Sequence, residues 1–325
     1  MKLYYKFAPF CWTLSLKKLL NTTFRKVMST WSSFCYLGEK TMNGVVIIDK
    51  SKGYTSHDVV NIIRKTLNMK KVGHAGTLDP NATGVLPILI GEATKISKYL
   101  IEHDKTYVAE LALGNKTTTG DSEGKIIEEK AVPKLTIDEI EKTLEECLGK
   151  QKQKPPAYSA IKINGKKAYE YAREGKEIEL EEREIEIHKI KLIKYENEII
   201  TFEVNCSKGT YIRVLCEDIA KKLKTVGNMK NLRRTKVDNF NLGQAVALEE
   251  IKGNSSIVGE KIISIEKIFE NQERIQLNEY KLNLFLNGVK LTYNKPNGVY
   301  RIYNENKFIG LGIIENNLLK RDIVI

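Results

Sequence analysis

The chain has 325 residues, 42% of them hydrophobic, and a formal net charge of +12 from 53 basic and 41 acidic residues. This length is typical of about two domains, and the charge favours a polyanionic partner without specifying one, because basic proteins with no nucleic-acid role are common. No run of 18 apolar residues occurs, which argues against a transmembrane helix. No two cysteines have a metal-ligand spacing, so we expect small buried residues in a reducing cytosol. The cysteines are Cys11, Cys35, Cys147, Cys206 and Cys216.

Residues 1–41 differ in composition from the rest of the chain. They contain no acidic residue and six basic residues before Glu39, and many aromatic ones. Acid-poor basic leaders are typical of transit peptides, but this one has a single arginine and no clear secretory cleavage pattern. We expect a disordered N-terminal extension, with a transit peptide as the alternative.

The first expected elements are a strand and a helix. The apolar run within 44–49 predicts a buried strand, and 51–53 predicts a turn. Ser56 is then placed to cap a helix that carries apolar residues at helical spacing. These are Val59, Val60, Ile62, Ile63 and Leu67.

The segment 73–86, GHAGTLDPNATGVL, is the most informative stretch. It holds three glycines, one of the four histidines (His74) and a single carboxylate, Asp79, followed by a proline and an apolar run. Glycine and proline punctuate a loop and favour unusual backbone angles. An aspartate there is either a turn former or a chemical group held in a defined place, and the residues alone leave both interpretations open.

The next elements alternate between strands and helices. We expect a helix over 93–100, a strand over 107–113 with alternating apolar residues, and a polar loop over 117–124. Thr136 and Glu139 resemble a capping box that opens a helix ending at Gly149.

A basic, proline-broken segment follows over 151–180. Its lysines alternate with Tyr158, Tyr169 and Tyr171, a pattern that suits phosphate contact together with stacking, although a solvated helix face would look similar. The lysines singled out are Lys162, Lys166 and Lys167.

The last part of the chain predicts mainly strands. Charge alternation over 177–191 suggests an edge strand, 199–206 a further strand, and Thr210 a cap for a helix to about residue 224. Residues 231–235 read as a short basic segment, 250–275 as a helical linker, and the chain from 278 onward as short strands.

Five segments together resemble the bacterial type of the TruB family of pseudouridine synthases. The longest is 73–86, and the others are 42–50, 91–95, 104–107 and 206–213. The resemblance is gapless in the loop and specific, strong over 42–250 and weaker over the last fifty residues. Bacterial members begin close to Met42, which favours a start codon assigned too far upstream as an explanation of residues 1–41.

The resemblance implies a cytoplasmic enzyme that converts uridine to pseudouridine at position 55 in the T loop of tRNA, by base flipping and attack by an aspartate, without a cofactor or metal. Asp79 matches the catalytic aspartate and Arg213 the arginine that pairs with it. The matches to base-pocket residues are Tyr107, Tyr211, Leu232 and Lys95. His74 matches the histidine that enters the RNA loop, while each of these residues taken alone could be an ordinary core, loop or surface residue.

The implied fold is α+β: a mixed sheet with flanking helices, an RNA-gripping insertion over about 151–180, and a small C-terminal β domain of the PUA-like RNA-binding type. The implied domains are a catalytic domain over 42–250, a linker over 251–274 and the small domain over 275–325. The implied partner is the tRNA T stem-loop, bound by a monomer with no obligate protein partner. The alternatives are a guide-RNA-dependent enzyme of the same fold, a non-catalytic RNA-folding module, and a plain α/β domain.

Overall fold

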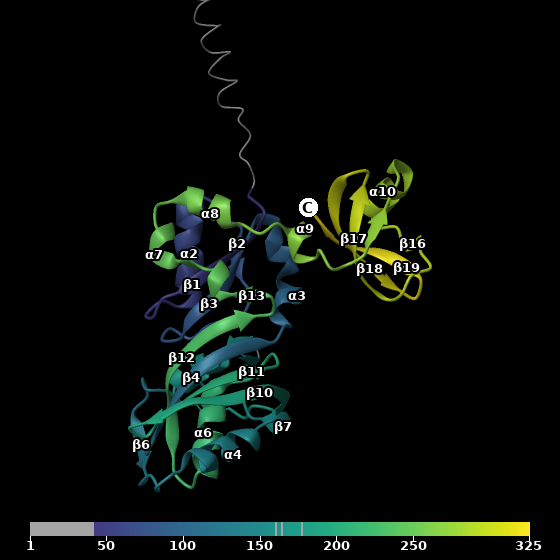
Figure 1. The fold of residues 1–325 in the computed structure, drawn as a ribbon. Helices are drawn as coiled ribbons and strands as arrows, with labels where there is room; N and C mark the ends of the chain where they lie inside the picture. Colours follow the sequence, from purple (N-terminus) through teal and green to yellow (C-terminus); the bar gives the residue numbers. More distant parts are fainter. Residues whose placement is uncertain (1–41, 160, 164, 177) are drawn as a thin grey trace, which may run out of the picture. The chain divides into compact units, whose positions relative to one another are not determined.

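A large mixed sheet forms the centre of the fold (Figure 1). The computed structural model describes residues 42–159, 161–163, 165–176 and 178–325, and the extension predicted over 1–41 lies outside them. In spatial order the main strands are β14 (Val246–Ala247), β1 (Gly44–Lys50), β3 (Thr83–Ile90), β12 (Gly227–Val237), β4 (Lys105–Leu113), β11 (Ile199–Cys206), β10 (Arg183–Glu196) and β7 (Gly149–Gln153). Two short strands, β2 (Val72–His74) and β13 (Phe240–Asn241), pair with β3 and β12.

Strand pairing follows the apolar patterns of the sequence. β1 and β3 are apolar along almost their whole length and are buried on both faces, as expected for strands inside a sheet. β4 alternates buried and half-buried residues, so that only one of its faces lies in the core. The strands predicted over 44–49, 107–113 and 199–206 are therefore confirmed.

The parallel pair β3–β12 depends on one glycine. Gly84 lies opposite Arg234, has φ +103°, and a Cβ at this position would lie 2.1 Å from the Arg234 carbonyl oxygen. Only glycine allows the two backbones to approach this closely. The contact brings β12 against the segment that carries Asp79.

Helices cover the sheet on its faces. α6 (Ile212–Lys222) packs on β12 and β4, and α4 (Ile137–Glu145) packs on β10, as Figure 1 also shows. The helix α2 (Ser56–Leu67) contacts β2. The remaining helical segments near the sheet are η1 (Gly91–Ile96), α3 (Ser97–Ile101), η2 (Leu242–Gln244), α7 (Leu248–Ile251), α8 (Ser255–Lys261) and α9 (Ile265–Ile268).

The capping box predicted at Thr136 and Glu139 is confirmed. The cap predicted at Ser56 is wrong, because Thr55 caps α2 and forms a capping box with Asp58. The cap predicted at Thr210 is also wrong: α6 begins after Tyr211, which makes no side-chain capping bond, and the Thr210 hydroxyl donates to the Ser207 carbonyl. Local composition identified the two helix starts but not the capping residue.

The predicted edge strand lies in β10 and is only partly an edge. β10 pairs with β7 over Arg183–Ile187, whereas Lys189–Glu196 pair with β11 alone. The short basic segment 231–235 lies within β12, where its alternate residues Leu232 and Arg234 are buried against β4. Charged residues can occupy an interior strand when their side chains leave the core face.

Short hairpins and one helix extend from the main sheet. β5 (Asn115–Thr117) pairs with β6 (Ile126–Glu129), and β8 (Lys162–Ile163) pairs with β9 (Lys166–Lys167). β9 leads directly into α5 (Ala168–Arg173).

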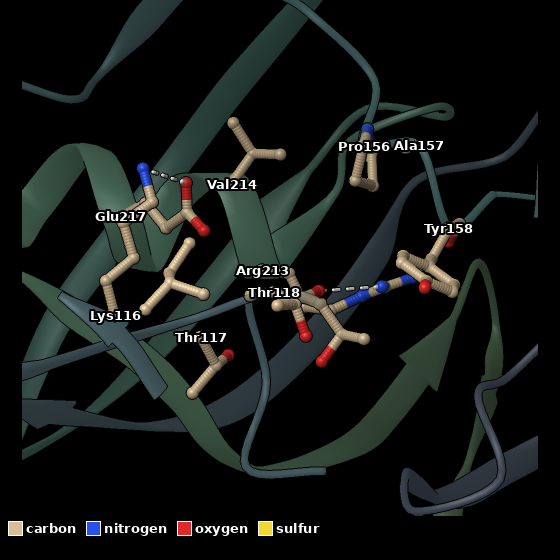
Figure 2. A pocket seen from close by; sticks show the side chains of 12 residues that line it. Lys116, Thr117, Thr118, Pro156, Ala157, Tyr158, Arg213, Val214 and Glu217 are labelled. Atoms are coloured by element: carbon tan, nitrogen blue, oxygen red, sulfur yellow. Dashed lines mark hydrogen bonds and ion pairs between the residues drawn. The ribbon is translucent and has the colours of Figure 1, made fainter. Parts of the chain in front are cut away.

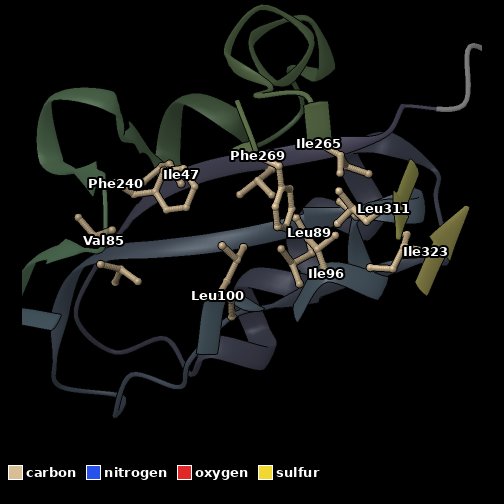
Figure 3. Packing of buried hydrophobic residues seen from close by; sticks show 14 residues of the cluster. Ile47, Val85, Leu89, Ile96, Leu100, Phe240, Ile265, Phe269, Leu311 and Ile323 are labelled. Atoms are coloured by element: carbon tan, nitrogen blue, oxygen red, sulfur yellow. The ribbon is translucent and has the colours of Figure 1, made fainter. Parts of the chain in front are cut away.

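The C-terminal part is a second sheet with one helix, α10 (Glu279–Leu286). Its order is β15 (Arg274–Gln276), β17 (Gly298–Asn304), β18 (Lys307–Glu315), β19 (Leu318–Val324) and β16 (Leu291–Thr292). Leu311 and Ile323 pack in one apolar cluster with Leu89 and Ile96 of the main sheet region (Figure 3). The predicted α+β class, a mixed sheet with flanking helices and a small β-rich C-terminal part, is confirmed. None of the described helices is both long and apolar enough to cross a bilayer.

Candidate active site

Asp79 lies in the loop between β2 and β3, and the backbone on both sides of it is held in place. On one side, the Ser56 hydroxyl of α2 accepts from the Leu78 amide at 2.8 Å and donates to the Leu78 carbonyl at 3.1 Å. On the other side, the Pro80 carbonyl accepts from the Gly53 amide at 2.9 Å and from the Lys50 ammonium at 3.0 Å. The loop is therefore rigidly positioned by the start of α2 and the end of β1.

The structure brings Asp79 and Arg213 together. The Arg213 Nη2 atom lies 3.2 Å from the Asp79 Oδ2 atom, and the Arg213 side chain is 8% exposed against 39% for Asp79. A buried guanidinium beside a half-exposed carboxylate orients that carboxylate while leaving it open to a substrate.

Arg213 is itself held by further partners. It donates to the carbonyls of Thr119 at 3.1 Å and Tyr158 at 2.9 Å, and its Nη1 lies 3.8 Å from the Asp121 carboxylate. Asp121 was not singled out from the sequence, where it lies in the polar loop 117–124 with nothing to mark it as a partner of Arg213. The guanidinium thus joins three segments around Asp79.

A pocket of about 240 Å³ lies beside Arg213, between the 117–120 loop, the 156–158 connector and α6 (Figure 2). Lys116 and Glu217 lie on one side of it, with their charged atoms 3.7 Å apart, and Tyr158 lies on the other. Burial raises the pKa of Glu217, and Lys116 opposes this shift. The pocket shows that the region around Arg213 is hollow.

Tyr107 and Leu232 lie on neighbouring strands. Tyr107 of β4 faces Arg234 of β12, and Leu232 faces Ala109, so the two predicted pocket residues lie on one pair of strands, 8% and 9% exposed. Burial raises the pKa of Tyr107, which keeps its phenol neutral. This arrangement offers an apolar, aromatic wall.

Tyr211 precedes α6 and is half-buried. Its backbone forms two hydrogen bonds with the Gln153 side chain, from the Tyr211 amide at 2.8 Å and to the Tyr211 carbonyl at 3.2 Å. Burial raises the pKa of Tyr211 as well. Gln153 therefore fixes the start of α6, two residues before Arg213.

Lys95 lies elsewhere: its ammonium pairs with Glu92 at 2.5 Å and donates to the Val324 carbonyl of the C-terminal sheet at 2.9 Å. These contacts connect it to β19, not to Asp79. The lysine beside the loop is Lys50, which sequence reasoning missed. Burial lowers the pKa of Lys50 to about 8, and the negative charge of Asp79 opposes that shift. The sequence feature that could have identified Lys50 is its position at the end of an apolar strand, directly before a turn.

His74 lies on β2, paired with Ile88 of β3, and is half-buried. Burial lowers the pKa of His74, as does the positive charge of Arg234, so its imidazole is uncharged near neutral pH. It is five residues before Asp79, at the other end of the loop.

The three predicted RNA-binding lysines lie on the β8–β9 hairpin. Lys162 is exposed, Lys166 pairs with Glu174, and the ammonium groups of Lys166 and Lys167 lie 4.9 Å and 5.4 Å from the ring centres of Tyr171 and Tyr169. Lysines stacked on tyrosines at a surface combine charge with flat aromatic faces.

In the described part of the chain, no group of three histidine, cysteine or acidic side chains is arranged to hold a metal ion. The chemistry available at the site is that of a carboxylate, a guanidinium and two tyrosines.

Comparison with known proteins defines the class. Residues 64–212 match the family model described as TruB family pseudouridylate synthase, N-terminal domain, and residues 213–268 match the tRNA pseudouridylate synthase B C-terminal domain. The fold and its aspartate loop are thus those of a pseudouridylate synthase.

Curated relatives are similar over nearly their whole length. The chain is 42% identical to tRNA pseudouridine synthase B of Caldanaerobacter subterraneus subsp. tengcongensis over 284 residues, which covers 86% of this chain and 98% of the relative. It is 46% identical to the protein of that name from Clostridium tetani over 277 residues, covering 83% and 95%. The chain belongs to the TruB family of pseudouridylate synthases.

Solved structures share the fold. One titled as an H/ACA RNP bound to a substrate RNA containing 2′-deoxyuridine has a TM-score of 0.64 at 22% identity, covering 87% of this chain and 85% of the other. A Cbf5-Nop10-Gar1 complex has a TM-score of 0.63 at 24% identity, covering 87% and 83%.

Proposed function

We propose that this chain converts uridine 55 in the T loop of tRNA into pseudouridine, with Asp79 as the catalytic carboxylate. The observation that carries the proposal is the Asp79 carboxylate, half-exposed and 3.2 Å from the buried Arg213 guanidinium. The similar proteins named tRNA pseudouridine synthase B support tRNA as the substrate. A tRNA substrate makes the cytoplasm the expected compartment.

The reaction is an isomerisation. The N1–C1′ bond breaks, the uracil turns, a C5–C1′ bond forms, C5 loses its proton and N1 gains one, so no oxidant or reductant is consumed. Asp79 acts at the sugar as a nucleophile or a base, and its ion pair with Arg213 fixes the direction of the carboxylate. Neither role requires a metal or an organic cofactor.

The target base has to leave the folded RNA before Asp79 can reach it, at a cost of roughly a few kcal/mol. Tyr107 supplies a buried aromatic face for the extruded base, and Leu232 and Tyr211 add further walls. His74, half-buried and uncharged at the other end of the loop, is suited to enter the space that the base leaves.

RNA binding outside the pocket is assigned to the 151–180 insertion, through Lys162, Lys166 and Lys167, and to the C-terminal residues 275–325. Lys281, Lys290 and Lys307 are exposed on the latter part. Positive side chains of this kind bind phosphates without reading sequence, so they add affinity and orientation. The catalytic domain of this proposal spans 42–250, the linker 251–274, and the chain acts as a monomer without an obligate protein partner.

The test is tritium release from unmodified tRNA transcript labelled at uridine C5, with purified chain alone. Wild type is expected to release tritium, and a transcript with another base at position 55 is expected to release none. Asp79→Asn should abolish release while tRNA binding persists. Asp104→Asn, which changes an exposed carboxylate outside the site, is the matched control and should retain activity.

An active Asp79→Asn protein would overturn the assignment of the catalytic residue. Tight tRNA binding without release by the wild type would instead indicate an RNA-folding protein or an enzyme that needs a guide RNA or partner.

A further inference from the structure

Arg234 is a buried cation without an acidic partner. Its side chain is 1% exposed, and burial lowers its pKa. Among the residues that the structure describes, no carboxylate lies within ion-pair distance of it, and Tyr107 is the group that stabilises its charge. An isolated buried guanidinium is costly unless its donors are satisfied, so its hydrogen bonds indicate what it does.

The donors of Arg234 converge on the Asp79 loop. Nε donates to the Val85 carbonyl at 2.8 Å, Nη2 to the Gly76 carbonyl at 3.1 Å and Nη1 to the Thr77 carbonyl at 3.4 Å. Gly76 and Thr77 precede Asp79, and Val85 follows it on β3. One guanidinium therefore spans the loop from its entry to its exit and closes it around the carboxylate.

The same guanidinium also reaches the opposite wall of the site. Arg234 and Tyr107 are directly opposed on β12 and β4, so their side chains lie on one face of the sheet. Both residues are buried, and the Tyr107 phenol lies close enough to stabilise the Arg234 charge. Arg234 thus binds the loop that carries Asp79 and lies beside the ring expected to stack on the base.

We propose that Arg234 is a positioning residue that fixes the separation between the Asp79 carboxylate and the Tyr107 ring. This inference rests on the proposed function. A planar guanidinium has donors in fixed directions and can hold three carbonyls in one geometry beside the Tyr107 side chain, whereas an ammonium is a point charge on a flexible stem. Reaction rates are sensitive to displacements of about 1 Å between reacting groups. Loss of the Arg234 hydrogen bonds should therefore slow turnover more than it weakens tRNA binding.

The experiment is a double-mutant cycle with Arg234→Lys and Tyr107→Phe. Tritium release is measured under single-turnover conditions at saturating enzyme, and tRNA affinity and thermal unfolding are measured separately. We expect Arg234→Lys to slow release about 10- to 100-fold, with tRNA affinity changed by less than about threefold. In the Tyr107→Phe background the same substitution should have a clearly smaller effect, because the hydroxyl that this proposal couples to Arg234 is already absent.

Arg64→Lys is the matched control. Arg64 is a half-buried arginine on α2 that donates to the Val72 carbonyl at 2.8 Å, and its replacement should leave the single-turnover rate within about twofold. Arg64 also donates to the Asn61 side chain at 3.4 Å, so the variant measures what an arginine-to-lysine change costs at a site outside the Asp79 loop.

If the reductions in single-turnover rate caused by the two substitutions multiply in the double variant, the two residues act independently. Arg234 would then stabilise the fold in general, and the proposal would be overturned. A wild-type single-turnover rate in Arg234→Lys would do the same. Where Arg234→Lys does not fold, Tyr107→Phe decides: a rate at least about tenfold lower supports the hydroxyl contact, and an unchanged rate contradicts it. Absence of tritium release from the wild type would refute the proposed function instead.

Discussion

The Arg213 guanidinium lies 3.2 Å from the Asp79 carboxylate, although the two residues come from segments far apart in the chain. Asp79 follows β2, whereas Arg213 is in the first turn of α6. Arg213 also approaches Asp121 and binds two carbonyls, so the position of the Asp79 carboxylate depends on the 117–124 loop and on the 156–158 connector.

Replacing Asp121 should weaken turnover. Its carboxylate lies 3.8 Å from Arg213 and accepts from the Thr119 hydroxyl at 2.6 Å. Asp121→Asn retains the shape but removes the charge that holds Arg213, so we expect about a tenfold lower single-turnover rate. Glu123→Gln, at an exposed position of the same loop, is the control and should be unaffected. Equal rates for the two variants would contradict this role.

Substitutions at Ser56 and Thr55 distinguish the positioning of the Asp79 loop from the capping of α2. Thr55→Ala removes the cap of α2 and should lower the free energy of unfolding by about 1 kcal/mol without slowing turnover. Ser56→Ala removes both hydrogen bonds to Leu78, next to Asp79, and should cost about 1–3 kcal/mol while also slowing turnover. Urea unfolding and single-turnover rates measure the two effects. The distinction fails if Ser56→Ala is destabilised but fully active.

Lys50 predicts a particular pH dependence of stability. Its pKa is lowered by burial from 10.5 to about 8. Between these values the unfolded chain holds more protons than the folded chain, so the free energy of unfolding should rise with pH there, by roughly 1–3 kcal/mol from this group. Below pH 8, Lys50 is charged in both the folded and the unfolded chain, so this group adds nothing to the free energy of unfolding there.

Urea unfolding at pH 7 and pH 9.5 provides the check. The wild type should gain stability relative to Lys50→Met between the two values, and Lys52→Met, at an exposed position, should behave like the wild type. Identical pH dependence in wild type and Lys50→Met would show that Lys50 does not titrate in this range.

Gly84 and Gly53 test the close approach of β3 and β12. Gly84→Ala would place a Cβ 2.1 Å from the Arg234 carbonyl oxygen at φ +103°, so we expect a loss of about 3 kcal/mol or more in unfolding free energy. Gly53 has a positive φ of +87° but nothing within 4 Å of a Cβ, so Gly53→Ala should cost only about 1–2 kcal/mol. Similar denaturation midpoints for the two variants would contradict the steric argument.

Local patterns predicted many elements correctly. The apolar runs of β1 and β11, the alternation of β4 and the capping box at Thr136 each depend on neighbouring residues alone, which is why the sequence reveals them. The cap at Ser56 was misassigned because Thr55 and Ser56 are both good capping residues, and the tertiary contact of Ser56 with Leu78 is invisible locally.

The order of the strands in the sheet was harder to predict from the sequence. The charge alternation of β10 suggested an edge strand, but β7 pairs with Arg183–Ile187, so that only the rest of β10 lies at an edge. Strand order depends on long-range pairing, which composition does not encode.

By itself, the sequence determined the class of fold, the aspartate loop and the family, since these depend on apolar periodicity and on a long gapless motif. Tertiary structure alone decided that Lys50, rather than Lys95, lies beside the loop, that Asp121 lies beside Arg213, and that Arg234 binds the Gly76 carbonyl while it lies opposite Tyr107. The physical reason is that a buried charge takes its partners from whichever segments the packing of the sheet brings within hydrogen-bond distance, and those segments are distant in the chain.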